Sequence, residues 1–156
     1  MYKSTLLVFF LLVSFTRSAF SQKPSDIEKK LIAYIDQHLP DAVNMLKESV
    51  NINSGTLNIA GVKKVGELYK KEKKKTGFTC TWITMPDSLK RAGHLVAERK
   101  GKKGKKLFLI GHLDTVFEPD MPFTPFTMLN DSTATGQGAN DMKGGDVVAI
   151  MALQAL

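Results

Sequence analysis

The feature that most constrains the fold is a run of four apolar residues, Leu107 to Ile110, followed directly by the motif Gly-His-Leu-Asp. A strand that is apolar at every position is usually covered on both faces, as in the middle of an α/β sheet. We therefore expect a strand over residues 106–111 that is buried on both sides. Binding sites in such sheets lie at the carboxyl ends of strands, which is where His112 and Asp114 stand.

His112 and Asp114 are two residues apart, and side chains at this spacing point to the same side of an extended chain. An imidazole and a carboxylate placed in this way can bind one metal ion or contact each other. The His-x-Asp pattern is short, however, and a histidine at the end of a strand is more often a hydrogen-bonded structural residue. This motif alone leaves both interpretations open.

A glycine-rich segment, "GQGANDMKGG" (136–145), carries a second candidate acid, Asp141. Its glycines permit an unusual backbone path and let a helix begin close to the sheet. Such a segment can present Asp141 to a site, or it can be a turn in which Asp141 or Asp146 caps the following helix. Its spacing matches neither the P-loop nor the dinucleotide-binding pattern, so we do not expect a phosphate-binding loop.

Helical periodicity and capping signals indicate helices in the first half of the chain. Ser25 and Glu28 have the spacing of a capping box, and the helix that they begin is expected to end before Pro40. A second helix is predicted over residues 41–51. A third, rich in lysine, is predicted over residues 58–76.

Strand signals follow these helices. Residues 78–84 and 94–99 predict strands, and the second is expected to pair with residues 106–111 as a hairpin. The last segment, "VVAIMALQAL" (147–156), is apolar almost all the way round, which is typical of a helix buried by its neighbours. Helices followed by strands of this kind predict an α/β domain with a mixed sheet flanked by helices.

The first 21 residues have the pattern of a secretory signal peptide, with Lys3 near the start and an apolar centre from Leu6 to Val13. Cleavage is expected before Gln22, so we predict an exported protein, either periplasmic or secreted. A spanning helix needs about 20 apolar residues, and this run is shorter. We therefore expect no stable membrane anchor after cleavage.

The formal net charge is +7, and the excess is concentrated in two lysine-rich segments, residues 63–75 and 99–106. The first segment lies on a predicted helix and the second in a predicted turn, so we interpret both as solvated surfaces and expect no nucleic-acid partner. Cys80 is the one cysteine, which leaves an exported chain without an internal disulfide. We interpret it as a buried, inert thiol.

Taken together, the two motifs resemble those of the zinc-dependent metallopeptidases that include glutamate carboxypeptidase, acetylornithine deacetylase, aminoacylase and related dipeptidases. "GHLDTVFEPD" (111–120) and "GQGANDMKGG" (136–145) are similar to that family's two N-terminal metal-site motifs, in the same order and at a compatible separation. "VNINSGTLNIAGV" (50–62) and "RAGHLVAERKG" (91–101) resemble the glutamate carboxypeptidase branch in particular. The resemblance extends over nearly all of residues 22–156.

The resemblance implies a site with two zinc ions, which cobalt or manganese can replace. It makes His112 a ligand of one zinc ion, Asp141 the carboxylate that bridges both, and Asp114 the catalytic carboxylate that orients or polarises His112. We therefore expect His112 and Asp141 to approach each other, with Asp114 within reach of His112. The implied reaction is hydrolysis of an amide next to a C-terminal residue, with glutamate expected, in a small peptide or N-acyl amino acid.

Other parts of the family's pattern have no counterpart in this sequence. The family's general base is the first of two adjacent glutamates, and no Glu-Glu pair occurs among Glu28, Glu48, Glu67, Glu72, Glu98 and Glu118. No histidine follows His112, and the family's lid domain, which also dimerises, is missing. We therefore interpret residues 22–156 as a partial catalytic domain that is inactive alone and is completed by a C-terminal fragment. The alternative is a non-catalytic exported module that binds a metal or a partner chain.

Overall fold

The computed structural model describes residues 23–156, and the predicted signal peptide lies outside the described residues. The chain divides into two compact units, residues 1–30 and residues 31–156. In the described part of the first unit, the backbone N and the Oγ of Ser25 both donate to Glu28 Oε2 at 2.7 Å, which is the predicted capping box. Within residues 23–156, no helix is both long enough and apolar enough to cross a bilayer.

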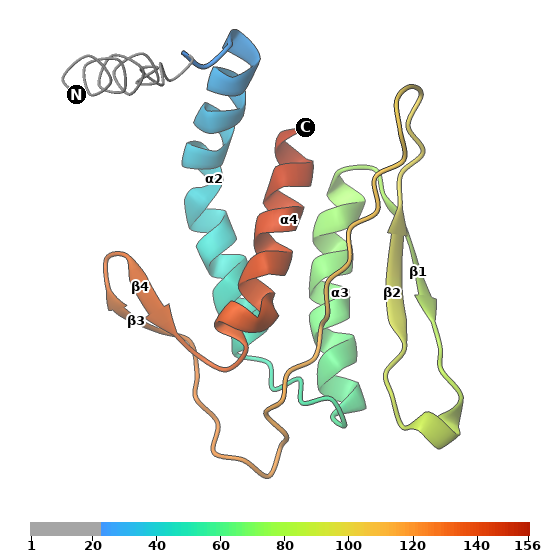
Figure 1. The fold of residues 1–156 in the computed structure, drawn as a ribbon. Helices are drawn as coiled ribbons and strands as arrows, with labels where there is room; N and C mark the ends of the chain where they lie inside the picture. Colours follow the sequence, from blue (N-terminus) through green and yellow to red (C-terminus); the bar gives the residue numbers. More distant parts are fainter. Residues whose placement is uncertain (1–22) are drawn as a thin grey trace, which may run out of the picture. The chain divides into compact units, whose positions relative to one another are not determined.

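Three helices pack on one another in the second unit (Figure 1). They are α2 (Asp26–Val50), α3 (Ile59–Lys75) and α4 (Gly144–Ala155). The later turns of α2 lie on one side of α4 and α3 lies on the other (Figure 1). The side chains that these helices bury against one another are Met45, Val65, Tyr69, Val147, Ile150 and Met151. This helical core fixes the start of α4, and therefore the turn that precedes it.

Helix α2 continues through Pro40, so the predicted break between residues 39 and 41 was wrong. A proline inside a helix removes one backbone hydrogen bond and costs about 3 kcal/mol. Tyr34 and Ile35 on one side of Pro40 pack against the same core as Ala42 and Leu46 on the other. The burial of this continuous apolar face offsets the cost of the proline.

Helix α3 matches its prediction to within one residue at each end. It begins after Asn58, whose Oδ1 accepts a hydrogen bond from Gly61 N at 3.1 Å. Asn58 Nδ2 also donates to the Asn53 carbonyl at 2.9 Å, so the cap ties the helix to the preceding loop. The last turn contains Lys73–Lys75, and these positive charges favour the negative end of the helix dipole.

The predicted strands at 78–84 and 94–99 are confirmed as β1 (Thr79–Ile83) and β2 (His94–Glu98), an antiparallel pair. Burial alternates along both strands, with intermediate positions between exposed ones. Trp82 packs against α3 at Gly66, where a β-carbon would collide with the indole ring. This contact places the sheet on the side of α3 away from α4 (Figure 1).

Residues 106–111 are extended, but they do not form the predicted strand or the predicted hairpin with β2. Leu107, Phe108 and Ile110 are 78%, 84% and 78% exposed, so the expectation of two covered faces was also wrong for this structure. The one strand paired with β2 is β1, and residues 99–106 carry six like charges whose repulsion opposes a tight turn. No strand within residues 23–156 supplies a neighbour for the apolar run.

A second antiparallel pair, β3 (Thr127–Asn130) and β4 (Thr133–Thr135), was not predicted from the sequence. Its turn is stabilised by Asn130, whose Oδ1 accepts a hydrogen bond from Ser132 N at 2.9 Å. Two short helical turns, Asp87–Leu89 and Ala139–Lys143, complete the elements. The α/β class is confirmed, but the described strands form two small antiparallel sheets in place of one mixed sheet.

Candidate metal centre

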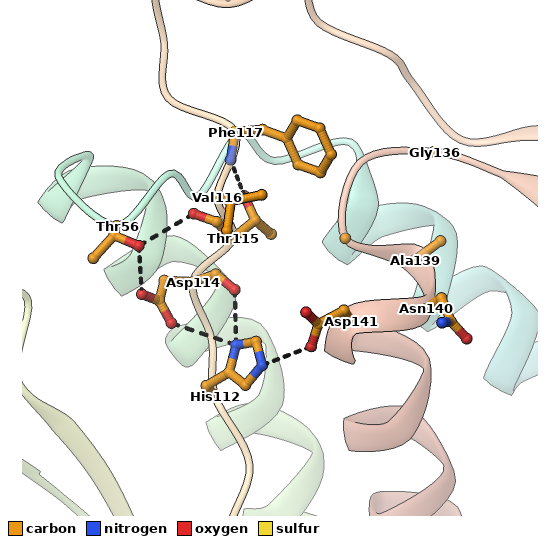
Figure 2. Close-up of a pocket in the computed structure, with 11 residues that line it drawn as sticks. Thr56, His112, Asp114, Thr115, Val116, Phe117, Gly136, Ala139, Asn140 and Asp141 are labelled. Atoms are coloured by element: carbon orange, nitrogen blue, oxygen red, sulfur yellow. Dashed lines mark hydrogen bonds and ion pairs between the residues drawn. The ribbon is translucent and has the colours of Figure 1, made fainter.

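The two sequence motifs meet at an open pocket of about 370 Å³ (Figure 2). Three parts of the chain line it: Thr56 from the loop between α2 and α3, residues 112–117, and residues 136–141 before α4. The pocket therefore depends on how the helical core and two loops are held together.

Two of the residues predicted to bind metal are in contact at this pocket. His112 Nε2 lies 2.9 Å from Asp141 Oδ1, with the histidine on the extended segment and the aspartate on the turn before α4. Figure 2 shows the two side chains pointing toward each other across the pocket. Their side chains are 44% and 81% exposed, so both can be reached from solvent.

The other ring nitrogen of His112 faces Asp114. His112 Nδ1 is 3.0 Å from the Asp114 carbonyl oxygen and 3.4 Å from Asp114 Oδ1. A proton on Nδ1 can be donated to that carbonyl, which leaves Nε2 as the free nitrogen on the side of Asp141. Asp114 therefore lies within reach of His112, as the sequence predicts.

Thr56 holds Asp114 in place, and its role was missed in the sequence. Its Oγ1 donates to Asp114 Oδ2 at 2.7 Å, and its backbone N donates to the Thr115 carbonyl at 3.0 Å. The segment "NINSGT" is notable in the sequence only as part of the family resemblance, because nothing local links it to a residue 58 positions away.

The protonated form of His112 is favoured by its surroundings. Partial burial lowers the pKa of His112, but the hydrogen bond to the Asp114 carbonyl and the hydrogen bond and charge of Asp141 outweigh this. The net effect raises the pKa of His112 above its ordinary value of 6.5. Zinc binding at Nε2 would have to displace this proton.

Lys143 anchors the turn that carries Asp141 to the end of α2. Lys143 is 1% exposed, and its Nζ donates to the carbonyls of Ser49 and Ile52 at 2.8 and 2.9 Å. Burial lowers the pKa of Lys143 to about 8. Tyr69 Oη donates to the Lys143 carbonyl at 3.3 Å, which ties the same residue to α3.

Glycine is required where the turn passes the His112 segment. Gly138 has φ of +72°, and a β-carbon there would collide with Thr115 Cγ2. This close approach places the turn that carries Asp141 against the segment that carries Asp114. Helix α4 begins without a side-chain cap, so the interpretation in which Asp141 or Asp146 caps it was wrong.

Asp146 is a further acidic residue near the site that the sequence did not single out as functional. Burial raises the pKa of Asp146 to about 6, although the charges of Lys73 and His112 act in the opposite direction. Its side chain lies against Gly111, where a β-carbon would collide with Asp146 Oδ1. Gly111 therefore permits the His112 segment to pass close to α4.

The chemistry of His112 and Asp141 fits zinc. Two ligand atoms that are each about 2.0–2.1 Å from one tetrahedral zinc ion lie about 3.3 Å apart. The observed 2.9 Å between Nε2 and Oδ1 needs only a small opening to admit the ion. Within residues 23–156, however, no three histidine, cysteine or acidic side chains are placed so that together they could hold one metal ion. The pair alone is fewer than the three protein ligands of a catalytic zinc site.

Comparison with known proteins relates the chain to a peptidase. No protein-family model matches it. Among curated proteins it is similar to carboxypeptidase G2 from Pseudomonas sp. (strain RS-16), with 31% identity over 140 residues. The match covers 89% of this chain and 32% of carboxypeptidase G2, so the chain spans about a third of the relative's length. The similarity to this carboxypeptidase therefore extends over nearly all of the present chain.

The pKa of His112 should fall when Asp141 loses its charge. In Asp141→Asn the attraction that stabilises the imidazolium is lost, so an NMR titration of the metal-free protein should show a lower pKa for His112 than in the parent chain. Because the folded pKa is raised, this group stabilises the folded state below pH 6.5 and the effect is lost as pH rises through the folded pKa. Asp131→Asn, at the exposed β3–β4 turn, is the control. An equal shift of the His112 pKa in both variants would contradict the His112–Asp141 contact.

Replacement of Lys143 by methionine should destabilise the fold. Methionine fills similar space but removes the Lys143 donor from both carbonyls, which leaves Ser49 O with only the bond from Ile52 N at 3.2 Å. Each lost hydrogen bond costs about 1–3 kcal/mol. We expect the free energy of unfolding in urea to fall by about 2–4 kcal/mol. Lys64→Met, on the exposed face of α3, should change it by less than about 0.5 kcal/mol. Similar losses in the free energy of unfolding for the two variants would show that the buried Lys143 ammonium group makes no specific contribution to stability.

Proposed function

We propose that the chain forms part of the catalytic domain of an exported dizinc metallocarboxypeptidase of the glutamate carboxypeptidase branch. The observation that carries the proposal is the convergence of His112 Nε2 and Asp141 Oδ1 at 2.9 Å, with the other ring nitrogen facing Asp114. The similarity to carboxypeptidase G2 supports the same reaction class.

In this proposal each residue has a distinct role at the pocket. His112 would hold one zinc ion through Nε2, and the Asp141 carboxylate would hold both zinc ions. Asp114 keeps the histidine in the orientation and tautomer that binding needs, and Thr56 keeps Asp114 in place. Zinc bound there would act as a Lewis acid on the scissile amide carbonyl.

The proton-transfer group of such a reaction is not supplied by the described pocket. The described residues that line it include no glutamate. Glu118, the nearest glutamate in sequence to His112, accepts hydrogen bonds from the backbone N of Leu57 at 3.0 and 3.2 Å. Loss of a general base costs about 10²–10⁴ in rate, so the chain by itself should not hydrolyse substrate.

The substrate class follows from the resemblance and from the relative. We propose a small peptide or N-acyl amino acid with a C-terminal residue, glutamate in the first instance. The described pocket lining contains no lysine or arginine, so the cation that would bind the substrate's carboxylate belongs to another part of the complete site. A complementary C-terminal fragment would supply that cation together with the missing ligands and base.

Export is the remaining part of the proposal. It rests on residues 1–21, with a basic start, an apolar centre and small residues before the expected cleavage point at Gln22. The single cysteine is compatible with an oxidising compartment, because it leaves no internal thiol pair to form.

A non-catalytic exported metal- or partner-binding module is the second candidate. The observation that favours it is the pair of ligands without a base at the described pocket. The catalytic candidate and the metal-binding form of the module both require His112 and Asp141 to bind metal, so a zinc-binding experiment tests what these two share. A chimera tests what separates them.

Zinc should bind the chain weakly and through the two predicted ligands. We expect isothermal titration calorimetry to give a dissociation constant that rises at least about tenfold in His112→Ala and in Asp141→Asn. His94→Ala, on β2 outside the pocket lining, should bind like the parent chain. If His94→Ala weakened zinc binding as much as His112→Ala does, the zinc ion would bind outside the predicted site.

A chimera should show whether the pocket supports catalysis. Residues 22–156 would replace the matching 32% of carboxypeptidase G2, so that the rest of that protein supplies the missing ligands and base. We expect zinc-dependent hydrolysis of an N-acyl glutamate, reduced at least about 10²-fold by His112→Ala. His94→Ala in the same chimera is the matched control. A folded chimera that binds zinc but hydrolyses nothing would favour the non-catalytic module.

A further inference from the structure

Two basic segments that are separate in the sequence meet at one end of the structure. Residues 70–75, in the last turns of α3, contain five lysines and one glutamate, and residues 99–106 contain six lysine and arginine residues and no acid. Arg99 joins them, because its Nη1 donates to the Thr76 carbonyl at 3.1 Å and its guanidinium lies 5.1 Å from the centre of the Phe78 ring. Each segment by itself is an ordinary solvated surface, but together they form one basic cluster.

The fold imposes this meeting. Helix α3 leads directly into β1, and β2 runs back antiparallel to it, with Thr79 opposite Glu98. The end of α3 and the segment that follows β2 therefore lie at the same end of the sheet (Figure 1). The one acid of the cluster, Glu72, is already paired with Lys75 at 2.8 Å and leaves the other cations uncompensated.

The basic cluster makes the charge distribution of the chain strongly asymmetric. It holds 11 of the 20 lysine and arginine residues in residues 22–156 and one of the 15 acids, so its net charge is +10. The remaining nine cations and 14 acids give the rest of residues 22–156 a net charge of −5. Asp114 and Asp141 at the metal pocket belong to this acidic part. Such asymmetry favours contact with an anionic surface in one orientation.

The basic cluster is a surface that further protein chain would leave in solvent. Residues 99–106 are all exposed, as are Lys71, Lys74 and Lys75. Packing of more chain covers apolar surface, whereas an ammonium group is almost never fully buried without a partner for its charge. The exposure of these side chains therefore does not depend on how much of a larger domain is present.

We propose that the basic cluster holds the exported chain reversibly on the surface of an anionic phospholipid bilayer. Ten of its eleven cations are lysine, whose ammonium group is a hydrated point charge suited to a diffuse layer of lipid phosphates. Neither segment contains an apolar side chain larger than glycine, so nothing inserts among the lipids. The contact is therefore electrostatic and sensitive to salt, unlike a membrane anchor.

A nucleic acid fits this surface less well. Neither segment contains an aromatic residue on which a base could stack, and the ring of Phe78 beside them lies under the Arg99 guanidinium. Arg99 is also the one planar cation of the cluster that could make a paired contact to a phosphate. Export, which is the one part of the proposed function used here, separates the chain from cellular nucleic acid as well.

Binding through the basic cluster would turn the metal pocket away from the bilayer. Thr56, which lines the pocket, lies three residues before α3 begins, whereas the cluster includes the last turns of this helix. The 17 residues of α3 span about 25 Å. An anionic surface also repels Asp114 and Asp141, which strengthens the same orientation. Substrate could then reach the pocket from the aqueous side.

Co-sedimentation with lipid vesicles tests the proposal. Residues 22–156, the chain as it would exist after the proposed cleavage, are mixed with phosphatidylcholine vesicles with or without about one third phosphatidylglycerol, at about 0.1 M salt. Lys102→Gln with Lys103→Gln removes two cations from the basic cluster. The matched control, Lys63→Gln with Lys64→Gln, removes two exposed lysines from the other end of α3. Both variants have the same net charge, so a difference between them reports position.

We expect the parent chain to bind the anionic vesicles at least about 25-fold more tightly than the neutral ones, and to be released at about 1 M salt. Each cation near the surface strengthens binding about fivefold, so the Lys102–Lys103 variant should bind about 25-fold more weakly. The Lys63–Lys64 control should lose less than about threefold, because its lysines lie more than a Debye length from the cluster. Glycerol phosphate at the phosphate concentration of the vesicles should not displace the chain.

Equal losses in the two variants would show that binding follows net charge alone and would overturn the proposal. Equal binding to neutral and anionic vesicles would overturn it too. Displacement by glycerol phosphate would assign the cluster to single phosphate groups, and displacement by duplex DNA at a lower phosphate concentration would assign it to nucleic acid; either result excludes the bilayer as its partner. None of these measurements involves zinc or hydrolysis, so their failure is distinguishable from failure of the proposed function.

Discussion

The structure depends above all on the buried ammonium group of Lys143. Its two hydrogen bonds reach the carbonyls of Ser49 and Ile52, at and just beyond the end of α2, where the helix leaves carbonyls without an internal partner. The positive charge also sits at the negative end of the helix dipole. One side chain therefore satisfies the end of α2 and anchors the turn that presents Asp141. The position of Asp141 in the candidate metal centre depends on this anchor, because Asp141 is only two residues away from Lys143.

The other half of the centre is held by a loop and not by a sheet. The segment that carries His112 forms a single parallel bridge, between Thr115 and Gly55. Asn53 Nδ2 donates to the Phe117 carbonyl at 3.1 Å, and Asn58, which caps α3, is bonded to Asn53 in turn. A chain of amide contacts thus runs from the start of α3 to the pocket. These contacts hold the backbone that follows His112. This part of the pocket therefore does not depend on the exposed residues that precede His112.

Sequence reasoning succeeded where the signal was local and failed where a distant partner decided the outcome. Ser25 and Glu28 are three residues apart, and their capping box was predictable because both halves lie in one turn. The same local rule at Pro40 was wrong, since packing on either side of the proline outweighed its backbone cost. The apolar run in residues 106–111 predicts burial, but burial needs a neighbouring strand that no local pattern guarantees. The candidate ligands were found by motif, whereas Thr56 was missed because it touches the site through the fold alone.

The contacts that build the candidate metal centre join residues that are far apart along the chain. The pair His112–Asp141 spans 29 residues, Thr56–Asp114 spans 58 and Ser49–Lys143 spans 94. Contacts of such long range form late in folding, because closing large loops costs entropy before any contact repays it. At a synthesis rate of about 5–20 residues per second, the first of these partners waits several seconds for the last. The His112–Asp141 pair is therefore complete only late in folding, so a metal ion that this pair would hold could bind both side chains only after the long-range contacts have formed.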